Sequence, residues 1–325
     1  AGDVSGCVAL LQSMLDRGVP PSAGHYSIVV AACKKAGQGR LAARLLKDAL
    51  AAGLVPPEED FVATMTACMA ESASNEGIAA WNRLRALKAE GAAPALSVKA
   101  YTAAMALKAM VGNAGGAREL LDMMEEAGLS PDLVAFNTVM RACAKAKDLP
   151  AAEVLLMRLR RVGLAPDGYT YSAAISAAIS NLPRALELLA EAEADAESQL
   201  ALAVYGAALS ACARAGAGRD ALALLERMRA RGVAPDMGCY SGALHALQAA
   251  GEWREVYDLL HSMRADGVLS LDNMRQSHVG LFQRAKKELG MVGQPAKSRP
   301  RRLHGSKVRG GRRRDKTSRA VPIVA

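Results

Sequence analysis

Cysteine is the residue type in this 325-residue chain with the clearest capacity for metal or redox chemistry, and six cysteines are present. Four of them recur at wide and related spacings: Cys33, Cys68, Cys143 and Cys212. Residues that recur once per helix pair lie on layers about 10 Å apart, whereas zinc holds thiolates at about 2.3 Å. Neither Cys7 nor Cys239 is part of a CxxC or CxH motif. We therefore expect reduced, apolar core residues, no metal site and no cofactor.

The remaining reactive side chains show no catalytic spacing. The five histidines are scattered without an HExxH pattern, and no glycine-rich phosphate loop follows a strand. Acids such as Glu125, Glu126 and Glu191 are spaced as on the solvated face of a helix. The sequence therefore predicts a protein that is not an enzyme and has no small-molecule substrate.

Positive charge is concentrated at the C-terminus. Segment 294–325 holds eleven Lys or Arg and one Asp, a net +10, so the rest of the chain carries −1 of the total of +9. The segment has no apolar periodicity, which predicts a disordered basic tail over 291–325. Five of its arginines are suited to phosphate contact: Arg301, Arg302, Arg312, Arg313 and Arg314. The interpretation that we favour is contact with RNA; a nuclear address or a dock for an acidic protein is the alternative.

The elements that must position these residues form an internal repeat. An aromatic residue recurs at intervals of 35, 40, 35, 35, 34 and 35 residues: Tyr26, Phe61, Tyr101, Phe136, Tyr171, Tyr205 and Tyr240. A glycine recurs near the end of most repeats, a proline follows in many, and three of the prolines are followed by Asp. Self-similarity at such a period is typical of solenoids.

Each repeat reads as two helices. The stripe from Ala221 through Leu225 to Met228 has the spacing of one apolar helical face. The glycine then permits a left-handed stop, and the proline prevents continuation. In two repeats we expect the irregularity in turns, as extra residues between Glu71 and Gly77 and as a shortened turn containing Pro183.

The period sets the predicted domain boundaries. Residues 1–22 match the second half of an incomplete repeat, 23–271 hold seven repeats, and 272–290 form a C-terminal capping helix. The seven repeats are 23–57, 58–97, 98–132, 133–167, 168–201, 202–236 and 237–271. Because the chain begins without Met inside a helical pattern, we expect a fragment or a processed form whose targeting information is missing. No apolar run is long enough to span a membrane.

A 35-residue unit with an aromatic fourth residue, a small polar fifth residue, a late glycine and a closing Pro-Asp resembles the pentatricopeptide repeat (PPR) of the P type. The repeat 133–167 matches best, and the resemblance covers about 1–271. It implies an all-α fold, a right-handed superhelical solenoid of antiparallel helix pairs. It also implies that the second, fifth and last residues of each repeat address one RNA base.

Carried over repeat by repeat, this resemblance implies a set of RNA-binding residues. Thr with Asp implies guanine at the first of these sites, and Asn with Asp implies uracil at the second. The residues are Lys99, Thr102 and Asp132; Val134, Asn137 and Asp167; Tyr169 and Ser172, closing at Ala201; and Asp236, whose repeat has Ala203 and Gly206 in the other two places. Solvated helix starts and caps are the alternative interpretation of Thr102, Asp132 and Asn137.

Lys35, Lys145 and Arg214 share one place near the end of the first helix of their repeats. Contact with an RNA backbone and an ordinary solvated face are both consistent with that place. Taken together, the residues and the resemblance predict binding of single-stranded RNA, organellar or ribosomal, in processing, stability or translation. We expect an organelle, the chloroplast rather than the mitochondrion. The alternative is a helical-repeat scaffold that binds other proteins, for example in a ribonucleoprotein or ribosome-associated complex.

Overall fold

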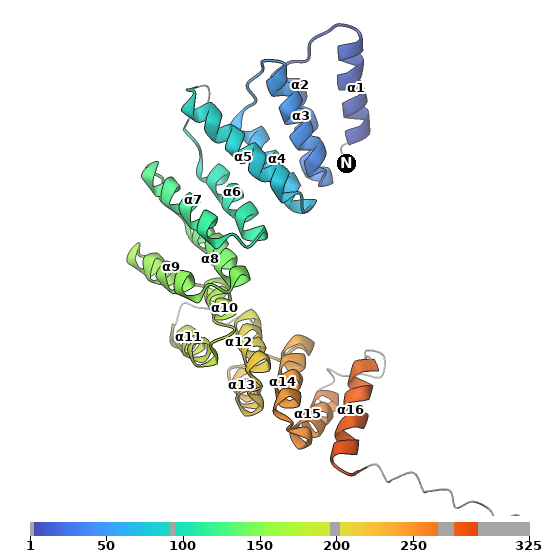
Figure 1. The fold of residues 1–325 in the computed structure, drawn as a ribbon, viewed down its shortest axis with the longest axis vertical. Helices are drawn as coiled ribbons and strands as arrows, with labels where there is room; N and C mark the ends of the chain where they lie inside the picture. Colours follow the sequence, from blue (N-terminus) through green and yellow to red (C-terminus); the bar gives the residue numbers. More distant parts are fainter. Residues whose placement is uncertain (1–2, 92–94, 196–201, 266–275, 292–325) are drawn as a thin grey trace, which may run out of the picture.

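The computed structural model describes residues 3–91, 95–195, 202–265 and 276–291, which form sixteen α-helices and no strand (Figure 1). The helices are α1 (Val4–Asp16), α2 (Ala23–Ala36), α3 (Gly39–Ala51), α4 (Glu58–Ala70), α5 (Ser74–Ala89), α6 (Val98–Met110), α7 (Ala114–Glu126), α8 (Leu133–Ala146), α9 (Leu149–Arg161), α10 (Gly168–Ala177), α11 (Leu182–Ala194), α12 (Leu202–Ala215), α13 (Gly218–Ala230), α14 (Met237–Ala250), α15 (Trp253–Ala265) and α16 (Gln276–Glu288). The predicted all-α solenoid is confirmed.

The even-numbered helices from α2 to α14 pack against one another in succession, and each is followed by an odd-numbered helix that packs on it. Figure 1 shows the resulting curve, with α7, α9 and α11 on its outer side and α6, α8 and α12 on its inner side. Neighbouring odd-numbered helices in the described part of the chain pack extensively only at α3 and α5. The first helices of successive repeats therefore form a continuous inner row.

Each inner helix from α2 to α14 starts at the first residue of a predicted repeat, and an aspartate cap fixes that start in α8, α10 and α14. Asp132, Asp167 and Asp236 each precede a helix and accept a hydrogen bond from the backbone N–H three residues later. Gly128 and Gly163 follow α7 and α9 with φ of 76° and 79°, a left-handed conformation that ends the outer helix. The Gly–Pro–Asp pattern thus separates one repeat from the next.

Two sequence expectations about turn lengths are wrong. The turn between α4 and α5 is residues 71–73, no longer than the turn 111–113 between α6 and α7, and the extra residues lengthen α5 to 16 residues and its following segment. Pro183 lies in the first turn of α11, and the short repeat is short because α10 has 10 residues. Proline is well tolerated in a first helical turn, because it gives up no hydrogen bond there.

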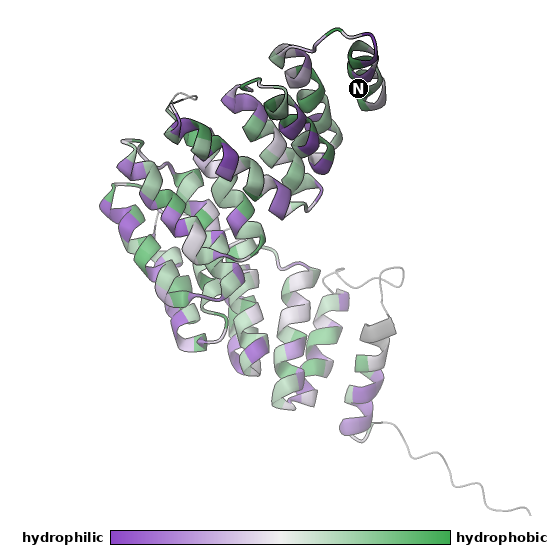
Figure 2. Ribbon diagram, turned by 45° about the horizontal axis from the view of Figure 1, so that its top comes forward, coloured by the Kyte–Doolittle hydropathy of each residue, from purple (hydrophilic) through white to green (hydrophobic). Residues whose placement is uncertain are grey.

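The recurrent aromatic residues form the core between layers. Tyr171, Tyr205, Phe61 and Phe136 are fully buried. Figure 2 shows apolar residues along most of the helices, with hydrophilic residues at many helix ends and on parts of the helices in between. At the C-terminal end, Tyr257 of α15 stacks on Phe282 of α16 with ring centroids 5.1 Å apart, which closes the last layer.

The four recurrent cysteines are also buried in this core, as expected of small apolar core residues. Burial raises the pKa of the Cys143 thiol to about 11 and that of Cys212 to about 12, so both stay protonated at neutral pH. In the described residues, no group of three or more His, Cys, Asp or Glu could hold a metal ion.

Three predictions fall wholly or partly outside the described residues. They are the start of the capping segment 272–290, the closing residue Ala201, and the tail with Arg301, Arg302, Arg312, Arg313 and Arg314. None of the described helices combines the length and the apolar character that a membrane crossing needs.

Candidate nucleic-acid interface

The most complete polar cluster on the inner row joins the repeat 133–167 to the repeat that follows it. Asn137, in the first turns of α8, donates from Nδ2 to Asp167 Oδ1 at 3.1 Å and to Oδ2 at 3.2 Å. Thr170 of α10 has its Oγ1 2.6 Å from Asn137 Oδ1 and 2.8 Å from Asp167 Oδ1, so its single proton serves one of these acceptors at a time. The fold therefore brings the predicted fifth and last residues into direct contact.

Two exposed side chains flank this cluster. Val134 of α8 is 60% exposed and Tyr169 of α10 is 77% exposed, whereas Asn137 and Asp167 between them are half-buried. An exposed aromatic ring beside a paired amide and carboxylate offers a stacking surface next to hydrogen-bonding groups. A planar base fits that arrangement chemically, and its recognition by these residues stays a prediction.

The neighbouring pair, Thr102 and Asp132, is arranged differently. Thr102 Oγ1 donates to the carbonyl of Val98 at 2.8 Å, and Asp132 Oδ1 caps α8 by accepting from the N–H of Ala135 at 2.8 Å. No hydrogen bond joins Thr102 to Asp132. The cap interpretation thus describes Asp132, which remains exposed together with Lys99.

The remaining predicted residues are less complete. Ser172 Oγ lies 3.2 Å from the carbonyl oxygen of Ala203, to which it donates. Asp236 caps α14 through the N–H of Cys239 at 2.8 Å. The fifth place of that repeat is Gly206, and nothing lies within 4 Å of where a side chain would begin. Asp236 therefore has no hydrogen-bonding side chain opposite it.

The basic residues at the far ends of the inner helices are not equivalent. Lys145 donates from Nζ to the carbonyl oxygen of Met110, at the C-terminus of α6 in the preceding repeat. Such a contact satisfies a free helix-end carbonyl and suits the negative end of the helix dipole. Lys35 and Arg214 are exposed at the corresponding places.

Acids on the outer helices pair with arginines of neighbouring repeats. Arg158 of α9 reaches Asp122 at 2.6 Å and Glu125 at 2.5 Å on α7. Arg184 of α11 reaches Glu153 of α9 at 2.6 Å. These acids link repeats across the outer surface, so they do not line the inner row.

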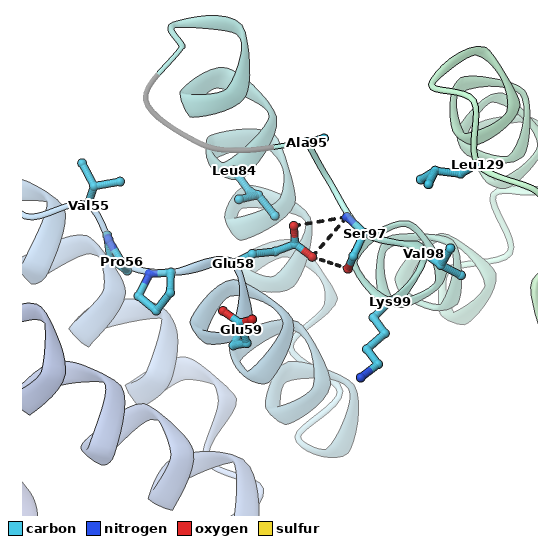
Figure 3. Close-up of a pocket in the computed structure, with 11 residues that line it drawn as sticks. Val55, Pro56, Glu58, Glu59, Leu84, Ala95, Ser97, Val98, Lys99 and Leu129 are labelled. Atoms are coloured by element: carbon cyan, nitrogen blue, oxygen red, sulfur yellow. Dashed lines mark hydrogen bonds between the residues drawn. The ribbon is translucent and has the colours of Figure 1, made fainter.

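Sequence reasoning missed a second polar contact on the inner row, at the repeat 58–97. Ser97 caps α6, and its backbone N–H and its hydroxyl both donate to the carboxylate of Glu58, the first residue of α4 (Figure 3). The signal was present, because a serine directly before an apolar helix is a typical N-cap. Because this repeat has 40 residues, its end does not align with the ends of the 35-residue repeats, and Ser97 was not assigned a role as its closing residue.

This contact borders a cavity of about 850 Å³ between the two repeats. Its walls include Pro57, Glu58, Glu59, Ser97 and Lys99 (Figure 3). Small-molecule sites typically have about 300–1,000 Å³, so the cavity is large enough for a nucleobase.

A further inner-row contact joins Ser27 of α2 to Asp60 of α4, with 2.6 Å between Oγ and Oδ2. Asp60 is only 6% exposed. Burial raises the pKa of its carboxyl group, and the hydrogen bond from Ser27 opposes that effect. Like Thr170, Asp60 is the third residue of its repeat, so third-place residues connect neighbouring repeats at both positions.

Comparison with known proteins agrees with this architecture. Models of the pentatricopeptide repeat domain match residues 89–145 and 119–181, and a PPR repeat model matches 203–233. The crystal structure of the maize pentatricopeptide repeat protein PPR10 is 22% identical and has a TM-score of 0.63, covering 90% of this chain and 42% of that one. This chain thus spans less than half of that protein.

Two complexes with RNA score lower. PPR10 bound to an 18-nucleotide psaJ RNA element has 18% identity and a TM-score of 0.48, with coverage of 88% and 47%. The PPR domain of Arabidopsis thaliana protein-only RNase P 1, bound to tRNA, has 18% identity and a TM-score of 0.47, with coverage of 56% and 95%. None of the curated proteins compared matches the chain.

Proposed function

Because the chain belongs to the pentatricopeptide repeat family, we propose that it binds single-stranded RNA along its inner row of helix starts. The observation that carries this proposal is the contact between Asn137 and Asp167, flanked by the exposed Val134 and Tyr169. In support, the maize protein PPR10, whose fold this chain shares, has been crystallised with an RNA element.

The chemistry of this pair suits uracil. Its Watson–Crick edge presents one N3–H donor between two carbonyl acceptors. The Asp167 carboxylate accepts from N3–H, and the Asn137 amide donates to a carbonyl oxygen. Tyr169 supplies a ring on which the base stacks, a contact that contributes about 1–3 kcal/mol per base. Lys99, Thr102 and Asp132 would address the neighbouring base, for which the Thr–Asp pair implies guanine, without a hydrogen bond between Thr102 and Asp132.

Affinity from base reading is limited, because only two neighbouring repeats have both a polar fifth residue and a closing aspartate. At about 1–3 kcal/mol for each good pair, they contribute about 2–6 kcal/mol, whereas micromolar binding needs about 8 kcal/mol. The rest comes from stacking and from basic residues on the phosphates, including Lys35 and Arg214. Binding is therefore salt-sensitive as well as sequence-dependent.

The test is a titration of short fluorescent RNAs containing GU, followed by anisotropy. We expect Asn137→Ala/Asp167→Ala to weaken binding about tenfold or more and to remove the preference for uracil. The matched control is Asn82→Ala/Asp48→Ala, the same residue types exposed on the outer helices α5 and α3. Equal affinities for the two double variants would contradict the proposal.

The cellular role that we propose is organellar, in the chloroplast rather than the mitochondrion, with bound RNA shielded during processing, degradation or translation. Its support is the family membership and the polar cluster at Asn137. A fluorescent fusion of the complete gene product tests the location. Crosslinking and sequencing of bound RNA, compared with a chain ending at Gly290, tests the role of the basic tail; capture that depends on the tail alone would contradict base reading.

A protein-binding scaffold remains the second candidate because of one outer groove. Between α3 and α5 lies a cavity of about 730 Å³ with an apolar floor that includes Leu46, Leu50 and Ala80. Arg44 and Lys47 stand on its rim without an acidic partner among the described residues. A photo-crosslinker at the exposed Ala79 distinguishes the two functions, since it captures a protein only if the groove is occupied in cells.

A further inference from the structure

We propose that in the repeat 58–97 the carboxylate of Glu58 reads the base in place of a closing aspartate, and that it selects guanine. This inference rests on the proposed binding of RNA. It assigns a recognition role to the first residue of a repeat, a place for which the resemblance implies none.

The pattern of first and last residues supports this exchange. In the three repeats that close with Asp132, Asp167 or Asp236, the first residue is apolar. In the repeat 58–97 the closing residue is the uncharged Ser97, and the first residue is Glu58. The other first residues are Ala23, Val98, Leu133, Gly168, Leu202 and Met237. Glu58 is the one charged residue in this place. The repeats that close with Pro57, Ala201 and Leu271 also lack a closing carboxylate, but their first residues carry no acid, so the exchange is specific to the repeat 58–97.

The contacts hold the Glu58 carboxylate where a closing residue lies. The N–H of Ser97 is 3.2 Å from each carboxylate oxygen of Glu58, and the Ser97 hydroxyl donates to Oε1. Glu58 is half-buried and Ser97 precedes α6, so the carboxylate spans the two repeats (Figure 3). A carboxylate has about four acceptor sites, and these three contacts leave about one of them, on Oε2, for a ligand.

Among the base-facing places of this repeat, only the Glu58 carboxylate can distinguish one base from another by hydrogen bonds. The fifth residue of the repeat is Val62, whose side chain has no hydrogen-bonding group. The second residues of this repeat and the next, Glu59 and Lys99, are exposed and line the same cavity of about 850 Å³. A base held between them would present its edge to Glu58.

Guanine is the base whose edge best suits the acceptor site that remains on Oε2. Its N1–H and N2–H₂ groups are adjacent donors, so one donates to Oε2 while the other also faces the negative carboxylate. Uracil flanks its single N3–H donor with two carbonyl oxygens, and adenine and cytosine each place an amino donor beside a ring acceptor, which a carboxylate repels. Hydrogen bonds to a charged acceptor are roughly twice as strong as neutral ones.

The experiment measures anisotropy of the full chain with the RNAs AAAXGUAAA and AAAUGXAAA, where X is each base in turn. We expect guanine at X to bind about tenfold more tightly than uracil in one of these series. Glu58→Gln, which has the same shape, reduces that preference below about twofold. Ser97→Ala, which frees the carboxylate, reduces it partly. Glu119→Gln, the same change on exposed outer helix α7, leaves it intact.

The outcomes separate this inference from the proposed function. If the wild-type chain binds none of these RNAs, the proposed RNA binding is wrong. If it binds but shows no preference for guanine at X, or if Glu58→Gln keeps the wild-type order of bases, the inference is wrong and RNA binding stands. Thermal unfolding of each variant shows that the compared proteins are equally folded.

Discussion

Two junctions on the inner row each place a carboxylate at the boundary between two repeats, but they take it from different residues. At the junction after repeat 133–167, Asp167 caps α10 and accepts hydrogen bonds from Asn137 and Thr170. At the junction after repeat 58–97, Ser97 caps α6, and Glu58 of the preceding inner helix brings the carboxylate. Each junction therefore has an acid at the boundary between two inner helices. At the first junction the acid belongs to the later helix, and at the second it belongs to the earlier helix.

The difference shows that the position of the acid follows the boundary between layers more than the place in the repeat. Three 35-residue repeats close with a Pro-Asp cap, so their acid lies at the start of the next inner helix: 98–132, 133–167 and 202–236. The 40-residue repeat has a longer α5 and connecting segment, and its cap is Ser97. An acid from the first residue of α4 then reaches the same boundary, because inner helices of adjacent repeats pack directly.

The largest expected effect tests whether the two junctions share one scaffold. Phe61 and Phe136, the fourth residues of the two repeats, are fully buried. Phe61→Ala and Phe136→Ala should each cost about 3–5 kcal/mol of the free energy of unfolding, through lost burial and a cavity. Urea denaturation measures both. A difference of more than about 2 kcal/mol between them would mean that the junctions do not rest on equivalent cores.

A smaller effect on stability is expected from the number of hydrogen-bond donors that each acid of the inner row has. Asp60 has one side-chain donor, Ser27, so Ser27→Ala should cost about 2 kcal/mol, within the range for hydrogen bonds to charged groups. Asp167 keeps the donors Asn137 and Thr170 N–H when the Thr170 hydroxyl is removed. Thr170→Val should therefore cost only about 1 kcal/mol. Urea denaturation that ranks the two changes in the opposite order would overturn this account of how each acid is satisfied.

The same contrast explains what could be predicted from the sequence. Aromatic, glycine and Pro-Asp residues recur because each layer needs the same core and the same stop, so the helix starts at Leu133 and Gly168 follow from the pattern. The contact of Asn137 with Asp167 was accessible through the resemblance for the same reason. The contact of Glu58 with Ser97 was not accessible, although Ser97 has the type and place of an N-cap, because the two residues lie 39 apart in a repeat of irregular length. The lengthening of α5 was also misplaced, since insertion into a helix leaves no turn residue as a marker.

The smallest expected effect concerns the pH dependence of the Ser27–Asp60 contact. Burial raises the pKa of Asp60 above its ordinary value of 3.8, so the folded chain holds this proton more tightly than the unfolded chain does. The resulting stabilisation is complete below the ordinary pKa and is lost as the pH rises through the raised value. At neutral pH the buried charge is therefore a cost, partly offset by Ser27.

Asp60→Asn removes that charge while its amide oxygen still accepts from Ser27. We expect an unchanged or slightly higher free energy of unfolding at neutral pH, by about 1 kcal/mol or less, and a flatter dependence between pH 7 and acid. Urea denaturation across that range measures both. The matched variant Asp132→Asn removes one carboxylate from an exposed cap of the same inner row, and it is measured beside Asp60→Asn. A slope that survives in Asp60→Asn would show that another group is responsible for it.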